Sequence, residues 1–202
     1  MNRPLFTTNR DIILASASPR RQSFLSELGL RFTVKPAAID ETPEPGEPAE
    51  TFVRRMAAGK AEAISSLKPE AMVIGADTVI SFQEEILGKP TDPTDALTIL
   101  QKLQGQSHIV MTALALYCRK DNLATTVVGT TTVTFGRFSR EVLKAYICSG
   151  EPMDKAGAYA IQGQGAFLIE KIDGSCSTVT GLPMNELVSL LLNHGIISVD
   201  HS

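Results

Sequence analysis

The sequence predicts an α/β fold built on a mixed β-sheet. In the first half of the chain, short strand-like runs alternate with stretches of helical periodicity, as in strand–helix units. In the second half, two long runs alternate between apolar and polar residues, at His108–Tyr117 and Thr125–Phe135. Such runs suit antiparallel strands. A sheet that combines strand–helix units with hairpins is mixed.

The first half supplies two expected helices and several short strands. Apolar spacing predicts helices over Pro19–Leu28, stopped by Gly29, and over Glu50–Ser66. A loop rich in proline and acidic residues, Ala37–Glu50, precedes the second helix. Strands are expected at Ile12–Leu14, Arg31–Lys35 and Ala71–Ala76, and a hairpin around Gln83 and Glu84 at Val79–Phe82 and Glu85–Leu87.

The second half adds helices on both sides of the two long strands. Thr94–Leu103 is expected to be a helix that ends before Gly105, and Ser139–Ser149 a helix with Ser139 as its N-cap. The remaining expectations are a Gly- and Ala-rich loop at Lys155–Ala166, a strand at Phe167–Lys171 and a final helix at Pro183–Asn193.

Composition excludes several classes of protein. A chain of 202 residues with a net charge of −3 is long enough for one substantial core and is not a general binder of nucleic acid or membrane surfaces. Three cysteines without C-x-x-C spacing form neither a disulfide framework nor a zinc site and fit a reducing compartment. No apolar run reaches the length of a membrane span, and the first ten residues lack a signal-peptide pattern. We therefore expect a single domain over residues 1–202 and a cytoplasmic location.

The stretch "LASASPRRQSFLSELG" places two arginines at the start of a helix. Ser18 is well placed as an N-cap and Pro19 as the first helical residue, so Arg20 and Arg21 fall in the first turn. Cations are mildly unfavourable there, by about 0.3–1 kcal/mol each. Either solvent surrounds both arginines, or the helix start is an anion site to which arginine adds a fork for phosphate. This stretch alone does not choose between the two interpretations.

Lys60 and Asp77 are candidate functional residues. Lys60 falls within the apolar stripe of its helix, four residues from Met56, where it either extends along the edge of the core or points into a cleft that takes an anion. Asp77 follows the apolar run at the expected carboxyl end of a strand. It either opens a turn, or it lies in a ligand crevice, where a carboxylate binds Mg²⁺ or accepts a proton from water.

Glu41 and Lys89 extend this set of charges. Glu41 lies in the acidic loop and Lys89 in "LGKP", and either one alone is a weak signal. Together with the two arginines, Lys60 and Asp77, they suit a nucleotide polyphosphate with a divalent metal ion. The cations offset phosphate charge, while the carboxylates hold metal and activate water.

The order of several motifs resembles the Maf family of nucleoside triphosphate pyrophosphatases. The resemblance extends from about Ile12 to Asn193, leaves "MNRPLFTTNR" outside, and is highly specific because so many motifs occur in the same order. It implies hydrolysis between the α- and β-phosphates, a requirement for Mg²⁺ or Mn²⁺, and a fold similar to inosine triphosphate pyrophosphatase: a long mixed sheet flanked by helices, with a cleft between two lobes. The motifs are "LASASPRR", "DET", "RMAAGKA", "GADTVI", "GKP", "GQSHIVMTALAL", "DKAGAYAIQGQGA" and "GLPMNEL".

The resemblance also implies roles for individual residues. Asp77 would accept the proton and bind metal with Glu41. The phosphate site would contain Ser16, Arg20, Arg21, Lys60 and Lys89, and Arg21, Lys60 and Lys89 would stabilise charge as pyrophosphate leaves. The sequence leaves open which phosphorus atom water attacks. Members of the family tend to form dimers, so a homodimer is implied, although no stretch identifies an interface.

Three positions that differ among branches of the family bear on the base. Arg20, Thr78 and Gln162 match members that act on dTTP and UTP rather than on 7-methyl-GTP. The side-chain amide of Gln162 has the donor and the acceptor that the O4 and N3–H edge of thymine or uracil requires. The alternatives are a pyrophosphatase for 7-methyl-GTP or for a modified pyrimidine such as 5-methyl-UTP, and a non-catalytic nucleotide-binding regulator of septum formation.

Overall fold

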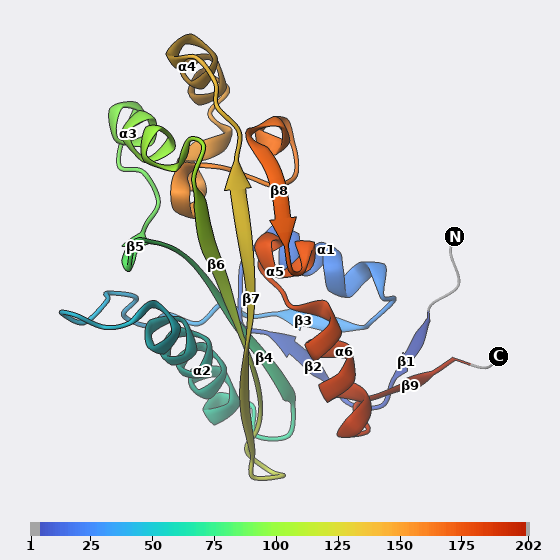
Figure 1. Ribbon diagram of the computed structural model, residues 1–202. Coiled ribbons are helices and arrows are strands. Elements are labelled where there is room, and N and C mark those ends of the chain that lie inside the picture. Colours follow the sequence, from blue (N-terminus) through green and yellow to red (C-terminus); the bar gives the residue numbers. More distant parts are fainter. Residues whose placement is uncertain (1–4, 201–202) are drawn as a thin grey trace. The chain divides into compact units, whose positions relative to one another are not determined.

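The computed structural model describes residues 5–200 and contains a seven-stranded mixed sheet and a separate two-stranded sheet (Figure 1). The large sheet has the order β3-β2-β4-β6-β7-β8, with β5 paired to β4. Its strands are β2 (Ile12–Leu14), β3 (Phe32–Val34), β4 (Met72–Phe82), β5 (Glu85–Leu87), β6 (Ser107–Cys118), β7 (Leu123–Phe135) and β8 (Ile169–Asp173). The small sheet pairs β1 (Phe6–Thr8) with β9 (Ile197–Val199) in antiparallel fashion.

Six α-helices and three short 3-10 helices accompany these strands within residues 5–200. The α-helices are α1 (Pro19–Glu27), α2 (Ala49–Leu67), α3 (Pro93–Leu103), α4 (Arg140–Cys148), α5 (Cys176–Thr180) and α6 (Met184–Asn193). The 3-10 helices are η1 (Glu151–Asp154), η2 (Ala156–Ala158) and η3 (Gln164–Leu168). Across the described part of the chain, none of these helices has both the length and the apolar character that crossing a bilayer requires.

The chain divides into two compact units, and neither is continuous in sequence. Among the described residues, unit 1 contains 5–77, 112–129 and 181–200, and unit 2 contains 78–111 and 130–180. Strands β4, β6 and β7 contribute residues to both units. The single domain expected over residues 1–202 stays a prediction, and residues 1–4 and 201–202 of that range lie outside the described residues.

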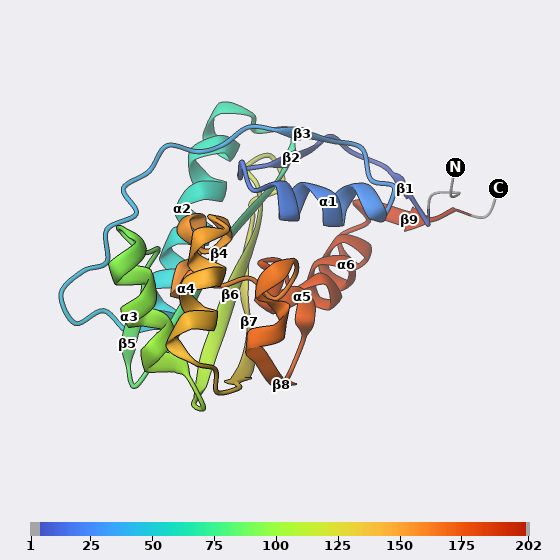
Figure 2. The ribbon, with the colours of Figure 1, turned by 90° about the horizontal axis from the view of Figure 1, so that it is seen from above.

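Helices cover both faces of the sheet within unit 1. Side chains alternate between the faces of a strand, so β4 sends Met72 and Ile74 to one face and Val73 and Gly75 to the other. The first face packs against α1 and α6 through a fully buried core. The other face meets α2 at Gly75, and Figure 2 shows α1 and α2 on opposite sides of β4. The first-face core includes Ile12, Leu14, Leu25, Met72, Ile74, Ala76, Leu187 and Leu191.

Unit 2 has its own core beneath α3 and α4. The apolar faces of these helices, with Leu100 and Leu143 fully buried, pack on side chains from β4, β6 and β7. Asp92 caps α3 by accepting hydrogen bonds from two backbone N–H groups, and Ser139 caps α4 by accepting one from Val142. Because Ser, Asp and similar caps satisfy otherwise unpaired N–H groups, these side chains fix where both helices begin.

The structure confirms the predicted helices to within a residue or two and corrects one strand assignment. Ala71–Ala76 and Val79–Phe82 form one continuous strand, so the prediction that Asp77 lies at a strand end is wrong. β4 continues because it changes partner: Met72–Ile74 pairs parallel with β2, and Ile80–Phe82 pairs antiparallel with β5. The expected turn at Gln83 and Glu84 is present, and both residues have positive φ.

Smaller corrections concern loops and caps. Ser18 lies at the N-cap of α1, but its side chain makes no capping hydrogen bond. The strand expected at Phe167–Lys171 begins later, at Ile169, because η3 extends through Leu168. The β1–β9 pair and helix α5 were not expected from the sequence.

A buried histidine gives unit 2 a testable pH dependence. His108 is 2% exposed, and its Nε2 lies 2.7 Å from the Tyr159 hydroxyl; within residues 5–200, its Nδ1 has no hydrogen-bond partner. Burial lowers the pKa of His108 from 6.5 to about 4. The folded protein therefore holds a neutral imidazole at a pH where the unfolded chain binds a proton.

We expect the protein to lose stability as the pH falls from 6.5 toward 4. The contribution of His108 is complete above pH 6.5, and it decreases by about 1.4 kcal/mol per pH unit below that value. The free energy of unfolding, measured in urea at pH 7 and pH 5, should therefore fall by about 2 kcal/mol from this group. The variant His108→Gln should show a shallower fall, and an identical fall in both proteins would contradict the assignment.

Candidate active site

Helix α2 lies against strand β4 closely enough for side chains to bridge them. A Cβ on Gly75 would lie 2.3 Å from the Ala57 carbonyl oxygen and 2.9 Å from the Cβ of Ala61, so only glycine fits. Asp77 is two residues beyond Gly75 and faces the same side of β4. Lys60, which precedes Ala61, can therefore reach it across a short gap.

Lys60 holds two carboxylates together. Its Nζ donates to Asp77 Oδ1 at 2.7 Å and lies 2.9 Å from Glu41 Oε1. The side chains of Lys60 and Asp77 are only 9% and 13% exposed, whereas that of Glu41 is 56% exposed. We call these three residues the carboxylate–lysine trio; it carries one positive and two negative charges. Since buried charges are costly unless paired, this contact fixes both side chains.

The loop that carries Glu41 is fastened to α2 by Arg55. The Arg55 guanidinium donates to both carboxylate oxygens of Glu47, at 2.8 and 2.6 Å, and to the Thr42 carbonyl at 3.1 Å. The hydrogen bonds from Arg55 to the carboxylate lower the pKa of Glu47 to about 2. Asp40 also stabilises the turn, because its Oδ1 accepts from the Thr42 N–H at 2.9 Å. The acidic loop is thus tied to α2 at Thr42 and Glu47, both of which follow Glu41.

Arg21 turns inward from the start of α1. Its Nε donates to the Gly181 carbonyl at 2.7 Å, and its Nη1 donates to Ser16 Oγ and to the Ala76 carbonyl, both at 2.9 Å. Burial lowers the pKa of Arg21, and the charges of Asp77 and Glu41 oppose that effect. The interpretation of two solvated arginines is therefore wrong for Arg21. Arg20 is exposed.

The remaining predicted site residues belong to unit 2. Thr78 follows Asp77 on β4 and is half-buried, whereas Lys89, after β5, and Gln162, between η2 and η3, are exposed. The segments that carry Lys89 and Gln162 meet within the unit, because Gly157 donates its N–H to the Gly88 carbonyl at 3.0 Å. Unit 1 brings together Ser16, Arg21, Glu41, Lys60 and Asp77.

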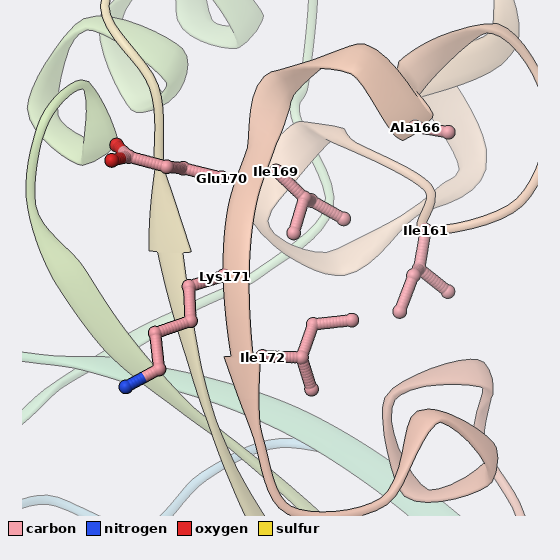
Figure 3. Close-up of a pocket in the computed structure, with 6 residues that line it drawn as sticks. All are labelled: Ile161, Ala166, Ile169, Glu170, Lys171 and Ile172. Atoms are coloured by element: carbon pink, nitrogen blue, oxygen red, sulfur yellow. The ribbon is translucent and has the colours of Figure 1, made fainter.

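Ile161, the residue before Gln162, lines a hollow of about 280 Å³. Figure 3 shows the side chains of Ile161, Ile169 and Ile172 directed into it, while Glu170 and Lys171 extend away. The side chains directed into the hollow are therefore apolar.

The site contains two carboxylates that could bind a metal ion. Asp77 and Glu41 both lie within 3 Å of one cation, the Lys60 ammonium, so their oxygens converge. Among residues 5–200, no group of three or more His, Cys, Asp or Glu side chains is arranged to hold a metal ion. Mg²⁺ commonly binds one or two carboxylates together with substrate phosphates. The residues present fit that pattern.

Sequence reasoning missed the residues that support the site. Arg55 and Glu47 are ordinary surface charges in the sequence, and their eight-residue separation corresponds to no helical spacing, since Glu47 precedes α2. Nothing local indicated that Gly181 would accept from Arg21. The glycine at position 75, in an otherwise apolar run, was the one signal of a close helix–strand contact.

Comparison with known proteins identifies the family. Residues 11–194 match the family described as Maf-like protein. The chain belongs to the Maf family. A Maf relative from Desulfotalea psychrophila named "dTTP/UTP pyrophosphatase" is 46% identical over 195 residues, which cover 96% of this chain and 100% of that protein. Relatives with the same name from Myxococcus xanthus and Nitratidesulfovibrio vulgaris are 48% and 42% identical; the matches cover 92% and 95% of this chain and 93% and 91% of theirs.

A solved structure shares the fold of this Maf protein. The chain resembles a HAM1 protein from Coxiella burnetii with a TM-score of 0.53 and 13% identity, over 91% of this chain and 99% of that one. Together with the observed seven-stranded sheet, this confirms the predicted class: a mixed sheet flanked by helices, similar to inosine triphosphate pyrophosphatase.

Proposed function

We propose that this Maf protein is a nucleoside triphosphate pyrophosphatase that hydrolyses dTTP and UTP to the monophosphate and pyrophosphate. The carboxylate–lysine trio carries the proposal, because it places a largely buried carboxylate beside a fixed ammonium group. A carboxylate in that position can accept a proton while the cation offsets phosphate charge. The names of the relatives support the choice of substrate.

In the proposed reaction, water attacks phosphorus at the α–β linkage. Lys60 engages Asp77 Oδ1, so Oδ2 is the oxygen that takes a proton from the water. A new oxygen–phosphorus bond forms, the bond in the anhydride bridge breaks, and one phosphate group keeps the bridging oxygen. Lys60, Lys89 and Arg21 stabilise the charge that develops on the phosphates, and Ser16 binds them.

A divalent cation, Mg²⁺ or Mn²⁺, would be held by Asp77 and Glu41. When bound it offsets phosphate charge and raises the acidity of water. Oxygens of both carboxylates lie within 3 Å of Lys60 Nζ, so the two side chains converge.

The base is read by Arg20, Thr78 and Gln162 in this proposal. The exposed amide of Gln162 can accept from N3–H and donate to O4 of thymine or uracil. Cytosine presents a donor in place of O4, so the same amide would discriminate against it.

The test is pyrophosphate release from dTTP, UTP, dCTP, ATP, GTP, 7-methyl-GTP and 5-methyl-UTP, with Mg²⁺ or Mn²⁺ and with EDTA. We expect the highest kcat/KM for dTTP and UTP and no release in EDTA. If kcat/KM is highest for 7-methyl-GTP or 5-methyl-UTP, the preferred substrate is a modified nucleotide. Binding of dTTP without release of pyrophosphate would instead support the regulator of septum formation.

Replacing Arg20 should change the choice of base. We expect Arg20→Trp to lower the ratio of kcat/KM for dTTP to that for 7-methyl-GTP by about tenfold or more. Arg31→Trp, at an exposed arginine of the same unit, is the matched control. An unchanged ratio would leave Arg20 as a phosphate ligand only.

Membership of the family also supports one proposal about cellular location and one about oligomeric state. We infer a cytoplasmic location, which agrees with three free cysteines, two of them exposed. We infer a homodimer from the family tendency, and sedimentation equilibrium would test it.

A further inference from the structure

The loop that carries Gln162 rests on hydrogen bonds more than on packing. Ile161 and Ala166, on either side of the loop, line the hollow of about 280 Å³ described above (Figure 3). Gln162, Gly163 and Gln164 are exposed. Because exposed residues make few packing contacts, the conformation of this loop depends on the groups that hold its backbone.

Glu151 holds the backbone just after Gln162. Its Oε2 accepts from the Gln164 N–H and its Oε1 accepts from the Gly165 N–H, both at 2.9 Å. Burial would raise the pKa of Glu151, but these backbone hydrogen bonds and one from Tyr146 lower it. The carboxylate is therefore ionised at neutral pH, and charged acceptors form the stronger hydrogen bonds.

Tyr146 holds the same loop on the other side of Gln162. Its hydroxyl accepts from the Ala160 N–H at 3.3 Å and donates to Glu151 Oε1 at 3.1 Å. Tyr146 lies on α4 and is 4% exposed, and burial raises the pKa of its hydroxyl, so it stays a donor. One connected pair thus fastens the chain at residues 160, 164 and 165.

Two glycines show how closely the loop lies against this pair. A Cβ on Gly163, whose φ is +92°, would lie 2.5 Å from Glu151 Oε2. A Cβ on Gly165 would lie 2.4 Å from the Tyr146 hydroxyl oxygen. Both contacts are too short for any side chain, so the two glycines permit the backbone to lie directly on the two polar groups.

We propose that Glu151 and Tyr146 are positioning residues that fix the Gln162 amide for recognition of the nucleobase. This rests on the proposed function, in which Gln162 reads the base. Without the pair, the amide would sample several positions, and a misplacement of about 1 Å can cost about 100-fold in a positioned step. The pair touches no phosphate in this proposal, so its loss should alter the choice of base more than turnover.

The experiment compares Glu151→Gln, Tyr146→Phe and Gln162→Ala, with Glu170→Gln as the control. Glu151→Gln keeps the size of the side chain but turns one acceptor into an amide N–H₂ that faces a backbone N–H. Tyr146→Phe keeps the ring and removes the hydroxyl. Glu170→Gln removes the same charge from an exposed position of the same unit. For each protein, kcat and KM are measured with dTTP and with dCTP.

We expect Glu151→Gln to reduce the ratio of kcat/KM for dTTP to that for dCTP at least about tenfold, chiefly through KM for dTTP. Tyr146→Phe should reduce it less, and Glu170→Gln should leave it unchanged. In a Gln162→Ala background, Glu151→Gln should change the ratio no further. A merely structural role would instead lower kcat/KM for both nucleotides equally, and that result overturns the proposal. If Glu151→Gln does not fold, the ratio of kcat/KM for dTTP to that for dCTP in Tyr146→Phe tests the proposal instead.

Binding separates this inference from the proposed function. Dissociation constants are measured for the non-hydrolysable α,β-imido analogues of dTTP and dCTP. Absence of pyrophosphate release from the unmodified protein would refute the proposed function, whereas a binding preference lost in Glu151→Gln and in Gln162→Ala would still support the positioning role. An unchanged binding preference in Glu151→Gln refutes the positioning role, whatever the activity.

Discussion

The variant Asp77→Asn should release pyrophosphate from dTTP roughly 1,000-fold more slowly than the unmodified protein, within the range of general base catalysis. An amide cannot accept the proton of the attacking water and is a poor ligand for a divalent cation. Its Oδ1 can still accept from Lys60 Nζ, which lies 2.7 Å from the corresponding oxygen of Asp77. The change therefore removes chemistry while keeping the contact that holds α2 to β4.

The measurement is kcat for pyrophosphate release at saturating dTTP, accompanied by the urea midpoint of unfolding. Asp11→Asn serves as the matched control, because Asp11 is an exposed aspartate of the same unit. Near-normal rates in Asp77→Asn would show that another group accepts the proton. A large drop in the urea midpoint would mean that the loss of activity reflects unfolding.

The variant Lys60→Met should lose both stability and activity. Methionine fills a similar volume, but the 13%-exposed Asp77 carboxylate then loses the ammonium group that donates to it and lies near a second carboxylate, Glu41. Removing one partner of a largely buried ion pair costs about 3 kcal/mol or more. Loss of the cation that offsets phosphate charge should lower kcat/KM for dTTP by about 100-fold as well.

A double variant separates charge from packing. Lys60→Met combined with Asp77→Asn removes the unpaired charge, so its free energy of unfolding should recover part of what Lys60→Met loses. Lys68→Met, at an exposed position just after the same helix, is the control and should change neither property. If the double variant is no more stable than Lys60→Met, the loss reflects packing, and the charge argument is wrong.

Local patterns in the sequence predicted the elements of the fold, because helices α1 to α4 and α6 have apolar faces and recognisable ends. Lys60 also stood out as a charged residue within an apolar stripe, although the sequence left open whether it extends along the edge of the core; the structure pairs it with Asp77. The prediction of two separate strands in place of β4 was wrong for a physical reason. The polar pair Asp77 and Thr78 interrupts the apolar run, but backbone pairing with β2 and then β5 keeps the strand extended.

Contacts between distant segments could not be predicted in this way. Arg21 depends on the Gly181 carbonyl, and Phe6 pairs with Val199, yet no local periodicity links such positions. Glu151 and Tyr146 lacked a signal for the same reason. Their role depends on a loop whose backbone approaches them only in the folded unit.

The long-range contacts of Arg21 have a consequence for biosynthesis. The carbonyl that it contacts is 160 residues further along the chain, and residues 181–200 belong to the same unit as the carboxylate–lysine trio. A chain emerging from the ribosome exposes Lys60 and Asp77 long before Gly181 and α6 are made. Synthesis proceeds at about 5–20 residues per second, so unit 1 waits several seconds for its last segment. Messages cut short before codon 181 should therefore yield chains in which Arg21 lacks this acceptor and the core of unit 1 lacks α6.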